Sequence, residues 1–289
     1  MNDQAQALRN LVRHHEQKTE ERSTRVITVT SGKGGVGKSN FSLNFALALQ
    51  RVGLKVLIFD ADIGMANIDV LMGVSSPYSL YHLLKQEKTI LDIIQEGPGG
   101  VHFIAGGSGF TDLLDLSAAQ LDFFSDQINR LHGQYDVILF DTGAGLSKET
   151  VRFIASAQET IVVTTPEPTS ITDAYALIKM VTAMEHDVKF KLVVNRAADN
   201  KEGHATADKI GLVSQRFLNI ELPVLGILPD DPNVMKAVKK QVPFSIAYPG
   251  SDATKSIMEI ARRFADVPAA PASSGGVKGF LHKMFRLSH

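Results

Sequence analysis

Seven short apolar runs, separated by helical patterns, dominate the middle of the chain. The runs begin at Val26, Val56, Val101, Val137, Ile161, Leu192 and Val224. Most of them are continuous rather than alternating, which is typical of strands covered on both faces. Helical periodicity lies between them, for example over residues 40–51, 117–131, 171–184 and 253–265. This alternation predicts one α/β domain with a mostly parallel sheet and helices on both faces.

The ends of the chain differ in composition from residues 25–267, which we assign to this domain. Residues 1–24 are polar and lack Gly and Pro. Within this segment, a helical spacing relates four residues, which are Leu8, Leu11, Val12 and His15. Residues 268–276 (PAAPASSGG) are typical of a flexible linker. We therefore expect a short N-terminal extension, the domain, a linker and a separate tail over residues 277–289.

Composition excludes several classes of protein. The chain has 289 residues, of which 44% are hydrophobic and 21% charged, an ordinary globular balance. Its net charge of −1 gives no support to nucleic-acid binding through a global positive field. The absence of cysteine excludes disulfides, zinc–cysteine sites, iron–sulfur clusters and a cysteine nucleophile. No apolar run reaches the roughly 18 residues of a membrane span, and no secretory signal is visible. We therefore expect a cytoplasmic protein.

The first predicted strand leads into a glycine-rich loop. Gly32 to Ser39 reads G-x-x-x-x-G-K-S between a strand and a helix, which is the context that a phosphate-binding loop requires. Glycines allow successive backbone N–H groups to converge on phosphate oxygens, and the helix start adds a favourable dipole. The pattern predicts that Lys38 contacts the β- and γ-phosphates and that the Ser39 hydroxyl binds Mg²⁺.

Two further strands end in acidic residues. Asp141 ends the apolar run VILFD, at the edge of a parallel sheet where ligands gather. We expect Asp141 to be the acid that supports the metal through a bound water. Asp60 and Asp62 follow the run VLIF, and one of them is a candidate to orient the attacking water. A turn of solvated carboxylates is the alternative for this pair.

Together these residues resemble the deviant Walker-A ATPases, the family of MinD, ParA and their relatives. The family loop K-G-G-x-G-K-[ST] is matched by Lys33 to Ser39, and the likeness extends over residues 25–266. The resemblance implies an ATP-dependent homodimer in which Lys33 reaches across to the partner's phosphates. A cation on a flexible stem can neutralise charge on the leaving phosphate. A solvent-exposed loop lysine is the alternative.

The resemblance also implies roles for other residues. Asp62 is expected to position the attacking water, with Asp60 as its neighbour near the metal. Asn195 is expected to read the adenine, and the backbone around Pro229 and Asp230 to line the base pocket. The remaining nucleotide-binding residues that it implies are Gly34, Gly35, Val36, Gly37, Lys38, Ser39 and Asn40. ATP and Mg²⁺ are the expected cofactors of a slow, switch-type ATP hydrolase.

Several branches of the family need chemistry that this chain lacks. The nitrogenase iron protein, the iron–sulfur scaffolds and the metal-binding targeting ATPases need cysteines. Bacterial tyrosine kinases of this fold carry a C-terminal tyrosine cluster, whereas Tyr248 is the last tyrosine here. DNA-partitioning ParA proteins bind DNA through basic surface, which the near-neutral charge does not support.

The tail combines an apolar stripe with a basic flank. Helical spacing relates Val277, Phe280, Leu281, Met284 and Phe285. The basic flank consists of Lys278, His282, Lys283 and Arg286. This pattern is typical of an interfacial membrane helix, as in MinD-like proteins, and predicts reversible binding to an anionic membrane surface. The flexible linker before it favours mobility over permanent docking. A helix that packs on its own domain is the alternative.

The N-terminus indicates one branch of the family, which controls the number and placement of flagella. Residues 3–9 (DQAQALR) are similar to the DQAxxLR motif of that branch. The same branch is also indicated by three further stretches, ADIGMANIDVLMG, AGGSG and DTGAGLS. The last of them has Gly143 where MinD usually has Pro. In that branch the motif activates the GTPase FlhF, so the partner-binding residues implied are Asp3, Gln4, Leu8 and Arg9. A tolerated disordered extension is the alternative.

These predictions combine into a membrane switch that dimerises on ATP, activates an FlhF-type GTPase and handles flagellar motor or C-ring proteins. Three other functions stay open at this point. They are a MinD-type division-site ATPase, a ParA-like DNA-partitioning ATPase, and a scaffold that binds ATP without turnover.

Overall fold

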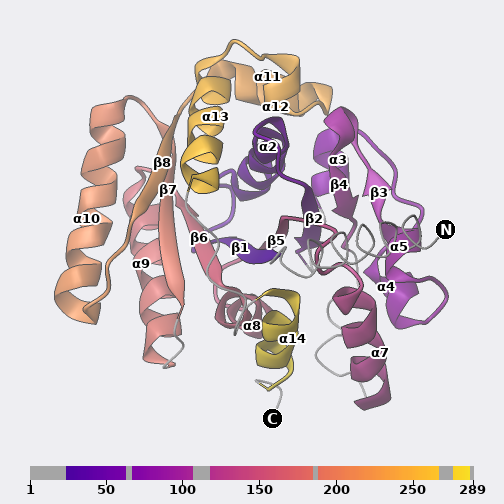
Figure 1. Ribbon diagram of the computed structural model, residues 1–289. Helices are drawn as coiled ribbons and strands as arrows, with labels where there is room; N and C mark the ends of the chain where they lie inside the picture. The colour runs from indigo at the N-terminus through magenta and orange to yellow at the C-terminus, as the bar shows by residue number, and fades with distance from the viewer. Residues whose placement is uncertain (1–23, 63–66, 107–117, 185–187, 267–275, 287–289) are drawn as a thin grey trace, which may run out of the picture.

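An eight-stranded sheet forms the centre of the computed structural model, which describes residues 24–62, 67–106, 118–184, 188–266 and 276–286 (Figure 1). The strands are β1 (Arg25–Ser31), β2 (Val56–Ala61), β3 (Gln95–Glu96), β4 (His102–Ile104), β5 (Val137–Ala144), β6 (Glu159–Thr164), β7 (Lys189–Ala197) and β8 (Val224–Pro229). Their spatial order is β3-β4-β2-β5-β1-β6-β7-β8. All neighbours pair in parallel except β3 and β4, which are antiparallel.

Helices cover both faces of this sheet (Figure 1). Those on one face are α2 (Lys38–Arg51), α3 (Ile68–Met72), α11 (Pro232–Lys240), α12 (Phe244–Ala247) and α13 (Asp252–Ala265). Those on the other are α4 (Leu80–Leu84), α5 (Ile90–Ile93), α7 (Ala118–Asn129), α8 (Lys148–Ser156), α9 (Pro168–Ala183), α10 (Asn200–Leu218) and α14 (Gly276–Arg286). A short 3₁₀ turn, η1 (Pro98–Gly100), precedes β4. The predicted α/β fold class is therefore confirmed.

Alternation along each strand divides the core between the two faces. In β1, Val26 points to the face of α8 and α14, while Ile27 points to the face of α2 and α13. In β5, Phe140 points to the face of α8 and α14, and Leu139 points to the face of α2 and α13. Both faces are buried because side chains of successive strand residues point in opposite directions. This double burial explains why the strands read as continuous apolar runs.

The strand register brings the chemically active segments to one edge. Asp60 of β2 lies beside Asp141 of β5, and Asp141 lies beside Val29 of β1. Strand β1 ends at Ser31, two residues after Val29, and the glycine-rich loop follows it directly. Three segments distant in sequence therefore end together at the carboxyl edge of the sheet, where open α/β proteins bind their ligands.

Helix α14 lies against the sheet between α7 and α8 (Figure 1). Its residues Val277, Phe280, Leu281 and Met284 are each at most 4% exposed and pack in the core of this face. Phe280 stacks on Phe140, with ring centroids 4.7 Å apart.

This docked arrangement is the alternative given for the tail, a helix that packs on its own domain, while the predicted mobility of the tail stays a prediction. Without α14, Phe140 of the sheet and Phe153 of α8 would face water, and the apolar stripe of α14 covers both. Burying each large apolar side chain contributes about 1.5–3 kcal/mol. Of the predicted linker over residues 268–276, residues 268–275 lie outside the described residues, whereas Gly276 is the first residue of α14 and not part of a linker.

No helix in the described part of the chain is long and apolar enough to cross a membrane. Residues 1–23 of the N-terminal extension fall outside that part, so the helix predicted within them stays a prediction.

Two glycines provide a test of the packing between α13 and β8. A Cβ at Gly226 of β8 would lie 2.3 Å from Cγ1 of Ile260, whereas nothing lies within 4 Å of a Cβ at Gly211 of α10. We predict that Gly226→Ala lowers the free energy of unfolding by about 1–3 kcal/mol through overpacking. Gly211→Ala, the matched control, should raise it by about 0.4–1 kcal/mol because it restricts the unfolded chain. Urea unfolding of both variants measures the difference, and equal effects would contradict it.

Candidate functional site

The glycine-rich loop joins β1 to α2 and leaves its backbone amides open. Gly35 and Gly37 have φ of +80° and +87°, in the left-handed region that favours glycine. Gly37 caps α2, and no side chain caps its first turn. A Cβ at Gly34 or Gly35 would meet nothing within 4 Å. The N-terminus of α2 therefore presents uncapped N–H groups and a favourable dipole to an anion.

A cavity of about 1050 Å³ opens in front of this loop. Its floor is the loop and the first turn of α2, including Lys38, Ser39 and Asn40. The ends of β2 and β5 contribute one wall, and the ends of β7 and β8 contribute the opposite wall. The volume of the cavity is therefore sufficient for a nucleotide, and the cavity lies where the sequence predicts one.

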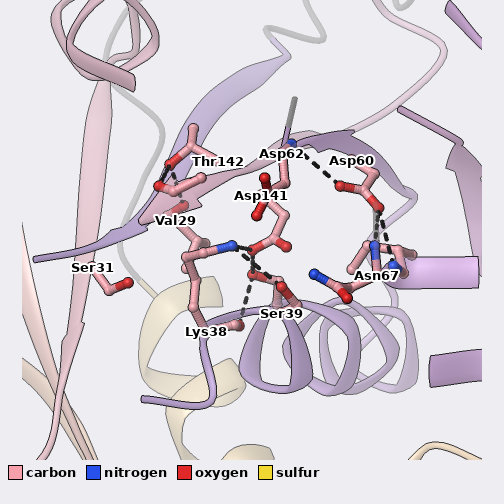
Figure 2. Close-up of polar contacts among 12 residues, drawn as sticks. Val29, Ser31, Lys38, Ser39, Asp60, Asp62, Asn67, Asp141 and Thr142 are labelled. Atoms are coloured by element: carbon pink, nitrogen blue, oxygen red, sulfur yellow. Dashed lines mark hydrogen bonds and ion pairs between the residues drawn. The ribbon is translucent and has the colours of Figure 1, made fainter. Parts of the chain in front are cut away.

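Lys38, which lines the cavity, forms a buried ion pair with Asp141, which lies behind the cavity lining (Figure 2). The Lys38 ammonium lies 3.0 Å from Oδ1 of Asp141, and the two side chains are 7% and 0% exposed. Ser42 donates to the same oxygen at 2.7 Å, and Lys38 donates to Ser39 Oγ at 3.2 Å. Oδ2 of Asp141 is buried without a hydrogen-bond partner among the described residues.

These groups fit a magnesium ion bound with a nucleotide. The orphaned Asp141 oxygen and the Ser39 hydroxyl are hard oxygen ligands of the kind that Mg²⁺ prefers. Among the described residues, no group of three or more His, Cys, Asp or Glu forms a metal cage of its own.

Asp60 accepts hydrogen bonds from the chain that follows β2 (Figure 2), and it does not line the cavity. Its Oδ2 accepts from the backbone N–H groups of Asn67 and Ile68, at 2.8 and 3.0 Å, and its Oδ1 accepts from that of Asp62 at 3.3 Å. Asp62 lines the cavity beside Gly143 of β5. The geometry favours Asp60 as a residue that positions Asp62, rather than one that contacts the nucleotide.

The environment of Asp60 predicts a pH dependence of stability. Burial, and then the charge of Asp141, raise the pKa of Asp60 from its ordinary value to about 7. Between about pH 4 and pH 7 the folded chain therefore holds a proton that the unfolded chain has released. The free energy of unfolding should fall as pH rises across this window, by up to about 1.4 kcal/mol per unit from this group, and then level off.

Urea unfolding of the nucleotide-free protein in EDTA, from pH 5 to pH 8, tests this prediction. Asp60→Asn keeps an oxygen that can accept from Asn67 and Ile68 but cannot titrate, so the variant should lose this part of the slope. The same slope in both proteins would assign the pH dependence to other groups.

The opposite wall of the cavity contains the predicted base-reading residue. Asn195 Nδ2 donates to the carbonyl of Val36 in the glycine-rich loop at 2.8 Å. Since a carbonyl only accepts, this bond fixes the orientation of the amide, and the amide oxygen and the second N–H are the groups that can contact a base. Pro229 and Asp230 line the same end. The roles of these residues toward adenine stay predictions.

Sequence reasoning missed several residues of the cavity. Arg196 lines the base end, has a left-handed φ of +58° and pairs with Asp230 at 3.4 Å. Ser147 and Thr150, at the start of α8, line the wall near Asp62. Arg196 follows Asn195 near the carboxyl end of the parallel strand β7, where ligands bind in open α/β sheets. This position could have predicted a role for Arg196 from the sequence. Ser147 ends the stretch DTGAGLS but had no predicted role there, and Thr150 belongs to no motif, so only the fold shows that both line the site.

Lys33 lies outside the cavity lining, although it belongs to the same loop. Its ammonium lies 3.1 Å from Oε2 of Glu167 and 3.0 Å from Oγ1 of Thr169, both at the start of α9. The loop thus holds one lysine within its own nucleotide site and a second one away from it.

The structure describes the predicted membrane-binding residues at the C-terminal end of the chain but not the predicted partner-binding residues at the N-terminal end. Asp3, Gln4, Leu8 and Arg9 lie outside the described residues. In α14 the apolar stripe is buried and Phe285 is partly buried, while Lys283 is exposed. Membrane binding by this helix stays a prediction.

The loop, the acid at the end of β5 and the parallel sheet define a P-loop nucleotide-binding protein. Residues 27–244 match the family described as the CobQ/CobB/MinD/ParA nucleotide binding domain. The chain therefore belongs to this family, as the resemblance of its loop to the deviant Walker-A ATPases predicts.

Its similar relatives include members of the flagellar branch that the N-terminal motif indicates, which is known as FlhG, YlxH or FleN. The chain is 37% identical to the antiactivator FleN of Pseudomonas aeruginosa, over 90% of this chain and 92% of that protein. It is 36% identical to the flagellum site-determining protein YlxH of Helicobacter pylori, over 99% of both chains. The prediction of this branch is confirmed.

Solved structures of division proteins share the fold. The septum site-determining protein MinD of Pyrococcus horikoshii, complexed with Mg-ADP, superposes with a TM-score of 0.68 and 26% identity. The likeness covers 84% of this chain and 96% of that chain.

Proposed function

We propose that this chain is an ATP-driven dimerisation switch that binds membrane reversibly and regulates the number or placement of flagella. The observation that carries the proposal is that two lysines of one loop lie in different places. Lys38 lies in its own nucleotide cavity, whereas Lys33 points out of it. An outward lysine beside a complete phosphate site is what a nucleotide-sandwich dimer needs. The flagellar assignment is supported by the relatives FleN and YlxH.

Nucleotide binding begins with an exchange of partners inside the cavity. Lys38 leaves Oδ1 of Asp141 and pairs with the β- and γ-phosphates, while the amides of Gly35 and Gly37 bind phosphate oxygens. Bound Mg²⁺ supplies positive charge that neutralises the phosphates. Asp141 and Ser39 are the residues that hold it.

Hydrolysis is assigned to Asp62 and Lys33. Asp62 lines the cavity on the side of β5 and α8, and it orients the attacking water. Lys33 of the second subunit contributes a positive charge at the leaving phosphate. Hydrolysis removes the phosphate that Lys33 of the second subunit contacts. The loss of this contact between opposite charges then weakens the dimer.

Membrane binding is assigned to α14. Its apolar stripe is buried against Phe140 and Phe153, so the stripe must leave this site before it can enter a bilayer. One short helix binds a membrane weakly. Two helices on one dimer gain effective concentration, which raises avidity by about 10²–10⁴-fold without new contacts.

Sedimentation with anionic liposomes tests this function. We expect much more binding with ATP than with ADP. Lys283→Glu changes an exposed residue of α14 and should weaken binding at least about fivefold. Lys201→Glu makes the same charge change on the exposed surface of α10 and is the matched control. Equal binding with ATP and ADP would refute the membrane switch.

The partners are an FlhF-type GTPase, reached through residues 1–24, and flagellar motor or C-ring proteins. Deletion of residues 1–23 ends before β1 begins at Arg25, so the sheet keeps all its strands. The deletion should abolish stimulation of the GTPase and leave ATP binding intact. Stimulation that survives the deletion would refute the role of this segment.

A further inference from the structure

Gly143 of β5 leaves a small space between two oxygen-bearing side chains of the cavity wall. A Cβ on this residue would lie 3.6 Å from Oδ1 of Asp62 and 3.7 Å from Oγ1 of Thr150, which are its two nearest atoms. These are ordinary van der Waals distances, so one carbon atom would fill the space without strain. The backbone of Gly143 is not in the left-handed region, so its conformation does not require a glycine. The effect of this glycine is therefore to keep the space between the two oxygens open.

The Thr150 side chain is held beside this space by Ser147. Thr150 lies in the first turn of α8 and is 2% exposed, and it lines the cavity. The Oγ of Ser147 donates to Oγ1 of Thr150 at 3.1 Å and accepts from the N–H of Thr150 at 3.1 Å. Ser147 thus supplies the cap of α8. Since the cap does not use the Thr150 hydroxyl, that hydroxyl is available for another role.

The proton of the Thr150 hydroxyl is only weakly engaged within the protein. Its acceptor is the carbonyl of Gly143 at 3.5 Å, which is at the long limit of a hydrogen bond. Oγ1 of Thr142 lies 3.2 Å from the same carbonyl and can donate to it. The carbonyl therefore keeps a donor when Thr150 turns its proton toward the cavity. A water molecule beside Gly143 can then accept this proton in a hydrogen bond.

We propose that Thr150 is a second residue that orients the attacking water, which it holds together with Asp62 in the space beside Gly143. This inference rests on the proposed function, in which Asp62 orients that water. A water molecule has two protons to donate and two lone pairs. The Asp62 carboxylate accepts one proton and the Thr150 hydroxyl donates to one lone pair. The second lone pair is then directed at the γ-phosphate.

Thr150 contributes orientation to the reaction and exchanges no proton in it. The water oxygen forms a bond to the γ-phosphorus, the bond from that phosphorus to the bridging oxygen breaks, and ADP leaves with the electron pair. Asp62 accepts one water proton and releases it to solvent, while the phosphate product keeps the other. A carboxylate alone leaves the water free to rotate about one hydrogen bond. A second fixed contact removes that freedom before the reaction, which lowers the barrier.

The first test removes the hydroxyl of Thr150. Thr150→Val should lower the single-turnover rate of ATP hydrolysis by about 2- to 12-fold, the value of one neutral hydrogen bond. Thr150→Ser keeps the hydroxyl and should retain most of the wild-type rate. ATP affinity and the dimer dissociation constant should not change in either variant. Thr182→Val, the matched control, removes a hydroxyl that bonds to the carbonyl of Ile178 outside the cavity lining. A wild-type rate in Thr150→Val, or an equal loss in Thr150→Ser, would overturn the proposal.

The second test fills the space and keeps every hydrogen-bonding side chain. Gly143→Ala places a methyl group between Asp62 and Thr150 and should lower the hydrolysis rate by about 10- to 100-fold, because the water is displaced from its position. ATP affinity should again be unchanged. Gly211→Ala adds the same methyl group where nothing lies within 4 Å and should have no effect on the rate. A wild-type rate in Gly143→Ala would overturn the proposal, whether or not Thr150→Val folds.

A double variant tests whether the two side chains act on one water. If they do, Thr150→Val should slow Asp62→Ala little further, because the oriented water is already lost. A merely structural effect of Thr150→Val would instead multiply with that of Asp62→Ala, and this result would overturn the proposal. A wild-type chain that does not hydrolyse ATP, or an Asp62→Ala protein with the wild-type rate, would refute the proposed function itself.

Discussion

Lys38→Met is expected to lower the affinity for ATP by about 10- to 100-fold, because it removes a charged donor to the phosphates. It is also expected to destabilise the nucleotide-free protein. Lys38 and Asp141 are almost fully buried, and the variant leaves the carboxylate with Ser42 as its one remaining side-chain donor among the described residues. Breaking a buried pair from one side costs about 3–5 kcal/mol. Isothermal titration calorimetry and urea unfolding measure the two effects.

A double variant separates these effects. Lys38→Met with Asp141→Asn removes both charges, so much of the lost stability should return. ATP binding should not return, because the phosphate donor and the metal-binding acid are both absent. Lys255→Met removes an exposed lysine and should change neither quantity. A double variant as unstable as the single one would contradict the role given to the buried pair.

Asp62→Ala is expected to lower the rate of ATP hydrolysis by about 10²–10⁴-fold, the range for loss of a group that positions a proton transfer. ATP affinity should change little, since the phosphates are held by Lys38 and the loop amides on the other side of the cavity. The dimer should therefore persist with ATP. Phosphate release and analytical ultracentrifugation provide the two readouts.

Asp208→Ala is the matched control for this variant, because Asp208 is exposed on α10 and away from the cavity. It should leave hydrolysis and dimerisation unchanged. An Asp62→Ala protein that hydrolyses ATP at the wild-type rate would remove Asp62 from the mechanism. One that stays monomeric with ATP would show that Asp62 supports the dimer rather than the water.

The sequence predicts the central sheet well because its strands are buried on both faces. Each of the seven apolar runs contains residues of a strand, and the helical patterns over 117–131 and 253–265 match α7 and α13 closely. The strand β3 was not predicted, because Gln95 and Glu96 are polar and two residues carry no periodicity. Helices α4 and α5 have five and four residues, too few for a hydrophobic pattern to repeat.

The tail shows a limit of amphipathic patterns. A stripe formed by Val277, Phe280, Leu281 and Met284 fits a lipid surface and an apolar protein surface equally well, since both exclude water. Only the fold reveals that Phe140 and Phe153 provide such a surface nearby.

In the candidate site, the sequence likewise predicts some residues and does not predict the contacts of others. Lys38, Ser39 and Asp141 are predictable because their motifs carry both chemistry and position. The partners of Asp60 and Lys33 are not, since Glu167 comes 134 residues after Lys33 and no motif joins them. Backbone contacts such as those of Asp60 with Asn67 and Ile68 depend on the course of a loop that residue types do not specify.

A mixture of two inactive variants tests most directly whether Lys33 acts on the partner's nucleotide. Lys33→Ala and Asp62→Ala are mixed in equal amounts with ATP, and phosphate release is compared with that of each variant alone. In a mixed dimer, the nucleotide on the Lys33→Ala subunit has its own Asp62 and receives the intact Lys33 of the other subunit. Random pairing in a two-fold dimer should then restore roughly a quarter of the wild-type activity. A mixture no more active than the separate variants would contradict a role for Lys33 across the dimer.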